Sequence, residues 1–126
     1  MKRTDAPRLI DILDHAHSLK RIIKANSIEE FINDDTIQAA VLYHLIVIGE
    51  AVANVTDDLK NKYPAIPWSD IKAFRNYVIH EYFNTDFQRV WNAATLEVPK
   101  LITNVKEIYT IEFPSLLQYL PPDDQD

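Results

Sequence analysis

Residues 75–82 combine an arginine, an amide, an imidazole and a phenol in the sequence Arg-Asn-Tyr-Val-Ile-His-Glu-Tyr. Arg75 offers a planar guanidinium that suits phosphate oxygens. His80 belongs to the residue type whose unperturbed pKa, about 6.5, lies near neutral pH. This set of side chains can break a phosphodiester bond without a metal ion, and the chain contains little else that could do chemistry.

RNA suits such a site because it carries its own nucleophile, the 2′-hydroxyl. Cleavage then needs only proton transfer and stabilisation of the charged phosphorane. His80 could move the proton, and Arg75 could neutralise the phosphoryl oxygens. One imidazole cannot be base and acid in the same step, but a two-fold dimer places two copies of every residue at its interface. We therefore expect a homodimer with a shared groove.

A helix would place these side chains on two faces. Asn76 and His80 are four residues apart and share one face, whereas Arg75 and Tyr82 are seven apart and share another. Arg75 and His80 lie about 140° apart around the axis, at roughly 100° per residue. The arginine can reach toward the imidazole but cannot stack on it. The motif therefore needs open space beside the helix, such as a cleft between subunits.

The N-terminal half is predicted to form two helices joined by a short turn. The first helix begins at Thr4 or Asp5, with Pro7 in its first turn. Ser27 and Glu30 form a capping box for the turn, and Asn33 or Asp34 caps a long helix over residues 35–59.

The C-terminal half supplies the motif helix and its neighbour. Prolines make residues 60–67 a loop, and the motif helix follows over residues 69–82 with Tyr82 facing inward. A capping box of Thr85 and Gln88 opens the next helix, which Pro99 should kink without ending, because the apolar spacing continues to Ile108.

Composition favours an all-α fold. Apolar residues make up 47% of the 126 residues and recur at helical spacing. Gly49 is the only glycine, which excludes the glycine-rich loops that hold phosphates. We predict an up-and-down bundle of four main helices plus a short helix, with residues 1–109 as the helical domain and residues 110–126 as a peripheral acidic tail.

The net charge, the metal-ligating residue types and the apolar runs exclude further classes of function. The net charge is 13 − 19 = −6, which argues against a protein that coats nucleic acid. There is no cysteine, and His15 and His17 are two residues apart, which on a helix cannot place them on one metal. We therefore expect no metal site and no cofactor. No run of about 18 apolar residues is found, so we expect no membrane span and a cytoplasmic protein.

The order of these residues resembles a known family. Arg75, His80 and Tyr82 match the Arg-x4-His-x-Tyr signature of HepT-like toxins in the HEPN ribonuclease superfamily, which occur in HEPN/MNT toxin–antitoxin systems. The flanking segments Ile48-Gly49-Glu50-Ala51 and Ile66-Pro67-Trp68 agree, and the resemblance covers roughly residues 7–108. A bare Arg-x4-His is common, but the whole ordered set is specific.

The resemblance implies a helical homodimer that acts as a metal-independent endoribonuclease, the toxin of such a system. Arg75 and His80 would be catalytic, with Asn76 supporting them. It also implies a partner, a small MNT-type nucleotidyltransferase antitoxin encoded beside it. The tyrosine corresponding to Tyr82 can be adenylylated by that partner, and the added bulk and negative charge would block RNA.

The individual residues also allow plainer interpretations. Arg75 could be a surface arginine paired with Glu50 or Glu81. Glu50, beside Gly49, could orient Arg75 across a packed interface or be an ordinary exposed residue. Tyr82 could pack with Phe83.

The whole chain has an alternative reading as well. It could be a non-catalytic subunit that binds nucleotide or substrate for a nucleotidyltransferase, or a plain dimeric scaffold.

His44 is better interpreted as a core or interface histidine than as a ligand, and Trp68 and Trp91 as core anchors.

Overall fold

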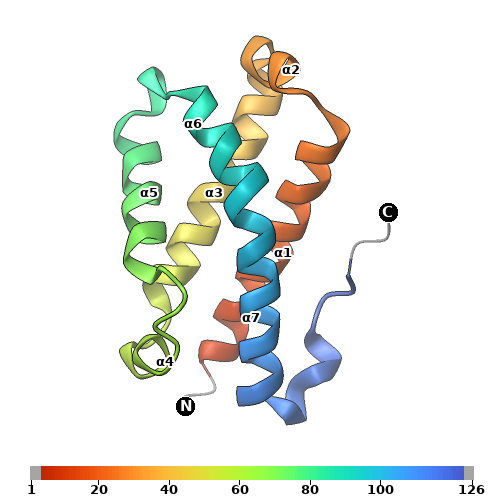
Figure 1. The fold of residues 1–126 in the computed structure, drawn as a ribbon, viewed down its shortest axis with the longest axis vertical. Coiled ribbons are helices and arrows are strands. Elements are labelled where there is room, and N and C mark those ends of the chain that lie inside the picture. The colour runs from red at the N-terminus through yellow and green to blue at the C-terminus, as the bar shows by residue number, and fades with distance from the viewer. Residues whose placement is uncertain (1–3, 124–126) are drawn as a thin grey trace.

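Helices account for the regular structure of residues 4–123, the part of the chain that the computed structural model describes (Figure 1). The prediction of an all-α fold is confirmed for these residues. The α-helices are α1 (Asp5–Ala25), α2 (Ile28–Asn33), α3 (Asp35–Asn54), α4 (Asp57–Lys62), α5 (Trp68–His80), α6 (Phe87–Asn92) and α7 (Val98–Glu112). Two 3₁₀ segments, η1 (Tyr82–Asn84) and η3 (Pro114–Tyr119), and one π-helix, η2 (Ala93–Glu97), complete the list.

The long helices share one apolar core. α3 packs against both α1 and α5, and α1 also packs against α7 (Figure 1). Their contact surfaces hold fully buried aliphatic side chains such as Leu9, Val41, Val52 and Val105, and burial of such side chains is the main favourable term in folding. α5 makes its main helix contact with α3. The motif helix is thus an outer helix, and much of its surface is open.

The expected caps of the first helices are confirmed. α1 begins at Asp5 after Thr4. The Ser27 hydroxyl accepts the Glu30 N–H at 3.1 Å, while the Glu30 carboxylate accepts the Ser27 N–H at 3.0 Å. The Asp34 carboxylate caps α3 by accepting the N–H of Thr36 at 2.9 Å. These side-chain bonds satisfy helix donors that have no partner within the helix.

The predicted helix over residues 35–59 is wrong at its C-terminal end. α3 ends at Asn54, Val55 is extended, and α4 begins after Thr56, whose hydroxyl accepts the Leu59 N–H at 3.4 Å. The apolar spacing runs on through both helices, because Val55 and Leu59 are both buried. Periodicity therefore concealed the break that the Thr56 cap makes.

Asp5 explains why the chain turns at Thr56. The Asp5 carboxylate is fully buried and accepts the Thr56 N–H at 2.9 Å and its hydroxyl at 2.6 Å. The bonds join the start of α1 to the start of α4.

We expect Asp5→Ala to lower the free energy of unfolding by about 2–3 kcal/mol, because it leaves two partly buried donors of Thr56 without their acceptor. Asp58→Ala removes an exposed carboxylate from the first turn of α4 and should cost less than about 1 kcal/mol. Urea unfolding of both variants at pH 7 measures the difference, and equal losses would contradict this role of Asp5.

The motif helix begins at Trp68 and ends at His80, which corrects the range 69–82. Tyr82 lies beyond the helix in η1 and is 43% exposed, so the expectation that it faces inward is wrong. The helical relation between Arg75 and Tyr82 therefore does not apply. Trp68 is buried as expected, and its indole N–H donates to the Tyr63 carbonyl at 2.9 Å.

The predicted capping box of Thr85 and Gln88 is also wrong. Asp86 is the N-cap of α6, and its carboxylate accepts the Arg89 N–H at 3.2 Å. The Thr85 hydroxyl instead donates back to the Glu81 carbonyl at 2.7 Å. Thr85 thus closes the end of the motif helix, and the next residue opens the following helix.

Pro99 is accommodated by the π-helix η2 directly before α7. Proline lacks an N–H and its ring clashes with the carbonyl four residues earlier, so a wider turn relieves both problems. α7 then continues to Glu112, beyond the expected end near Ile108, and Phe113 after it is buried. The division into a domain of residues 1–109 and a tail of residues 110–126 stays a prediction, and residues 124–126 lie outside the described part.

Glu112 fastens the end of α7 to the loop after α4. Its carboxylate accepts hydrogen bonds from the Lys62 ammonium at 2.8 Å and from the Tyr63 hydroxyl. The Lys62 bond, followed by the Tyr63 bond, lowers the pKa of Glu112. Burial, with Glu112 as a second cause, raises the pKa of Tyr63 to about 12.

A lowered carboxyl pKa stabilises the fold above its unfolded value, about 4.5, and this stability is lost as the pH falls through the folded pKa. We therefore expect Glu112→Gln to reduce stability by about 1–2 kcal/mol at pH 7 and to flatten the decline in stability below pH 4.5. Urea unfolding at pH 7 and in steps below pH 4.5 checks this. An unchanged acid limb would show that Glu112 is not the titrating group.

α3 is long and apolar enough to cross a membrane by length and composition, with a mean hydropathy of 1.6 in its most apolar window. Polar residues interrupt this helix, so the sequence contains no continuous apolar run of that length. In the described residues 39% of the window is buried, and α3 packs against α1 and α5. The central helix of a small helical bundle passes the same test, so this is weak evidence for a membrane span.

Candidate active site

Gly49 lets the motif helix approach α3 closely. A Cβ atom added to Gly49 would overlap the Cβ of Arg75 and lie 2.5 Å from its Cγ. The first carbons of the Arg75 side chain therefore lie where any other residue would place its own side chain. The only glycine in the sequence stands at the point where Arg75 crosses α3.

Glu50, the next residue of α3, pairs with this arginine. The Nη1 atom of Arg75 donates to Oε2 of Glu50. The Arg75 side chain is only 14% exposed, whereas that of Glu50 is 61% exposed. Of the two carboxylates considered from the sequence, the structure places Glu50 and not Glu81 against Arg75. The ion pair between Arg75 and Glu50 thus lies at the boundary between protein and solvent.

One edge of the guanidinium is left without a partner. The Nε atom of Arg75 is buried and, among the described residues, has no hydrogen-bond acceptor. Buried donors are seldom left unpaired, so such an atom calls for an explanation. An anion that approached the outer edge of this guanidinium would find it held in place.

His80 is the last residue of α5 and is exposed. Within residues 4–123 its imidazole has no hydrogen-bond partner. Asn76, four residues earlier on the same helix, is exposed as well. The structure therefore confirms that Asn76 and His80 share an open helix face, while Arg75 faces α3.

Exposed apolar side chains surround the end of α5. Ile79 is 46% exposed, Tyr82 is 43% exposed and Phe83 is 95% exposed. The rings of Tyr82 and Phe83 meet edge to face at 5.7 Å. We call these three residues the α5-end patch. Exposed apolar side chains that gather next to polar ones are typical of a contact surface.

The remaining histidine pair joins α1 to α3. The Nδ1 atoms of His15 and His44 lie 2.9 Å apart, so one ring donates and the other accepts. Burial, and then the neighbouring His15 and Arg21, lowers the pKa of His44. His44 is thus a satisfied, half-buried histidine, as predicted. Among the described residues no group of three or more His, Cys, Asp or Glu side chains could hold a metal ion.

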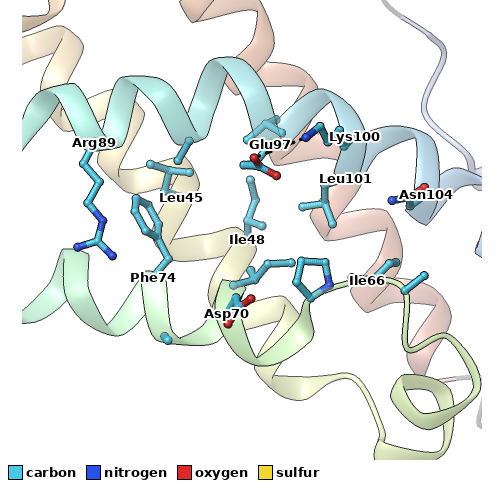
Figure 2. A pocket seen from close by; sticks show the side chains of 16 residues that line it. Leu45, Ile48, Ile66, Asp70, Phe74, Arg89, Glu97, Lys100, Leu101 and Asn104 are labelled. Carbon is cyan, nitrogen blue, oxygen red and sulfur yellow. Dashed lines mark ion pairs between the residues drawn. The ribbon is translucent and has the colours of Figure 1, made fainter.

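A groove lies beside α5, between this helix and the segment from α6 to α7 (Figure 2). Its volume is about 730 Å³. Leu45 and Ile48 of α3 form its floor, and Phe74 and Leu101 its walls. Arg75, Asn76, His80, Glu50 and Tyr82 do not line it. The predicted site residues are therefore not in this groove: Asn76 and His80 lie on the exposed surface of α5, Arg75 lies between α5 and α3, Glu50 is on α3 and Tyr82 is in η1.

The sequence profile of the family described as "Ribonuclease HepT-like" matches residues 12–108. The chain belongs to the HepT-like ribonuclease family. The matched residues include α3, α5 and η1, and with them all five predicted site residues. Membership supports RNA as the substrate and a ribonuclease-like role for this HepT-like chain.

Named relatives agree with this membership. "Putative RNase MJ1216" of Methanocaldococcus jannaschii is 37% identical over 107 residues, which cover 85% of this chain and 88% of the relative. "Putative RNase TTE0752" of Caldanaerobacter subterraneus is 35% identical, covering 84% and 95%. "Probable ribonuclease HepT" of Thermococcus cleftensis is 33% identical, covering 80% and 92%. No solved structure matches this HepT-like chain significantly.

Proposed function

We propose that this HepT-like protein is a metal-independent endoribonuclease that uses His80 and Arg75. The observation that carries the proposal is that α5 holds both groups. Its last residue, His80, is an exposed imidazole, and Arg75, five residues earlier, packs against Gly49 and forms an ion pair with Glu50. His80 accepts the proton of the RNA 2′-hydroxyl, whose oxygen then attacks the adjacent phosphorus. Arg75 stabilises the charge that gathers on the phosphoryl oxygens.

The step is completed when the 5′-oxygen leaves and takes up a proton. The products are a 2′,3′-cyclic phosphate and a 5′-hydroxyl. Glu50 keeps Arg75 oriented through the ion pair between its carboxylate and Nη1 of the guanidinium. Asn76, exposed on the same face as His80, is suited to hydrogen-bond the substrate.

An RNA with a 2′-O-methyl group at the cleaved nucleotide tests this chemistry. The protein should cut the unmodified strand to a 2′,3′-cyclic phosphate and leave the methylated strand intact, because the nucleophile is blocked. Mass spectrometry of the fragments reads both outcomes. Cleavage of the methylated strand at the same bond, or a 5′-phosphate product, would exclude attack by the 2′-hydroxyl.

A homodimer supplies the second proton-transfer group. The α5-end patch lies at the end of the motif helix, and its apolar side chains suit contact with another subunit. Two-fold symmetry would bring a second His80 to the same site between the two subunits. A folded monomeric variant that cleaved RNA at the normal rate would remove the argument for a shared site.

We further propose that the protein is the toxin of a toxin–antitoxin pair, neutralised by a nucleotidyltransferase that adenylylates Tyr82. The Tyr82 side chain is 43% exposed just beyond His80. Adenylylation there would add a phosphate and a nucleoside beside the RNA site, and charge repulsion and bulk would exclude the substrate.

We expect Tyr82→Phe to cleave RNA at close to the normal rate and to escape neutralisation by the partner enzyme with ATP. The measurement is residual cleavage after incubation with the partner, together with the mass of the intact protein. Phe83→Ala, which keeps the Tyr82 hydroxyl, should still gain the mass of an adenylyl group. Equal neutralisation of wild type and Tyr82→Phe would contradict modification at Tyr82.

A further inference from the structure

Arg89 of α6 is held over two aromatic rings of the motif helix. Its guanidinium carbon lies 4.1 Å from the ring centroid of Tyr77 and 5.4 Å from that of Phe74. Cation–π attraction at such distances fixes a side chain that would otherwise move freely. Figure 2 shows Arg89 reaching from α6 toward α5 at one end of the groove.

This cation has no carboxylate partner. Arg89 is exposed, and within residues 4–123 no ion pair or side-chain hydrogen bond of its guanidinium is found. Several other cations of the described chain do have carboxylate partners, among them Arg75 with Glu50, Lys62 with Glu112 and Lys106 with Asp123. In a chain of net charge −6, a fixed and unpaired guanidinium is a local site for an anion.

Tyr77, on which Arg89 stacks, connects this guanidinium to the helix turn that carries His80. Tyr77 precedes His80 by three residues on α5, and side chains at that spacing are neighbours on the helix surface. The Tyr77 hydroxyl also accepts the Asp86 N–H at 2.9 Å, which ties the start of α6 to α5. The same ring therefore positions both the helix that carries Arg89 and the guanidinium itself.

We propose that Arg89 binds a backbone phosphate of the RNA strand beside the scissile nucleotide and thereby positions the substrate. The proposal rests on RNA being the substrate in the proposed function. Stacking covers one face of the guanidinium but leaves its N–H edge free, and this edge matches two phosphate oxygens. The alternative is a purely structural role, in which Arg89 only holds α6 against α5.

The salt dependence of RNA binding separates these roles. The probe is a fluorescent single-stranded RNA with 2′-O-methyl riboses, which can bind but cannot be cleaved, measured by anisotropy from 50 to 200 mM NaCl. We expect Arg89→Gln to weaken binding about tenfold at 50 mM NaCl and to reduce the slope of log K against log salt by about 0.7, the value for one phosphate contact on a single strand. Arg89→Lys should keep most of the slope but bind more weakly.

Arg8→Gln is the matched control, because Arg8 is an exposed arginine near the start of α1, at the opposite end of the bundle from α6 (Figure 1). It should leave affinity and slope unchanged. If Arg89→Gln has the same RNA affinity and salt slope as Arg8→Gln, or lowers only the melting temperature, the role of Arg89 is purely structural and the proposal is overturned.

Cleavage of unmodified RNA, measured separately, keeps this inference apart from the nuclease proposal. Binding that depends on Arg89 without any cleavage would refute the nuclease and leave the phosphate contact standing. Failure of the wild-type protein to bind the probe would refute the phosphate contact.

Discussion

Replacing His80 by alanine is expected to slow RNA cleavage by about 10²–10⁴-fold, the usual contribution of a positioned proton-transfer group. The fold should be unaffected, because the imidazole is exposed and has no hydrogen-bond partner within residues 4–123. The measurement is single-turnover cleavage of a labelled RNA at pH 7, with thermal melting and molar mass checked on the same preparation.

Glu81→Gln is the matched control for His80→Ala. Glu81 is the adjacent residue, is exposed, and has no role in the proposed chemistry. It should cleave RNA at close to the wild-type rate. If His80→Ala retains full activity, or if both variants lose it equally, the imidazole is not the proton-transfer group.

Replacing Gly49 by alanine should have the second large effect. The new Cβ would overlap the Cβ of Arg75 and crowd its Cγ, atoms too close to the α5 backbone to move aside. Overpacking of this kind costs about 1–3 kcal/mol. Because the shift displaces Arg75 from Glu50, we also expect a loss of RNA cleavage that exceeds the loss of folded protein.

The sign of the stability change caused by Gly49→Ala decides whether the close contact exists. Glycine to alanine inside a helix ordinarily stabilises it by about 1 kcal/mol, so a more stable and active Gly49→Ala variant would contradict the close contact. Ala39→Ser on the exposed face of α3 should change stability by less than about 0.5 kcal/mol. Urea unfolding and cleavage assays on both variants provide the comparison.

The sequence was sufficient for features that depend on local chemistry. The Ser27 and Glu30 capping box, the start of α1 and the helical setting of Arg75 and His80 all follow from neighbouring residues, and the structure has them. The end of α3 could not be found this way. Val55 and Leu59 keep the apolar spacing across the break, and the buried Asp5 that fixes Thr56 lies 51 residues away.

In the candidate site, too, the sequence predicts what depends on local spacing but not what depends on packing between helices. The spacing of Asn76 and His80 was enough to place them on one face. Whether Arg75 pairs with Glu50 or Glu81 depends on how closely α3 and α5 pack, which Gly49 decides. The position of Arg89 could not be predicted, because its cation–π contacts require the approach of α6 to α5.

The predicted helical position of Tyr82 is wrong for a related reason. The apolar spacing predicts a helix that ends two residues too late. In the structure the Thr85 hydroxyl donates to the Glu81 and Tyr82 carbonyls and closes the turn. This bond competes locally with the helix. Tyr82 therefore lies in η1 with a side chain that is 43% exposed.

Cleavage of pooled cellular RNA by the wild-type protein in excess EDTA tests the central claim most directly. We expect fragments that end in 2′,3′-cyclic phosphate, produced at the same rate with and without EDTA and absent with His80→Ala. RNA that stays intact under these conditions, or that His80→Ala cleaves as fast as the wild type, would contradict a nuclease that works through its own imidazole and guanidinium.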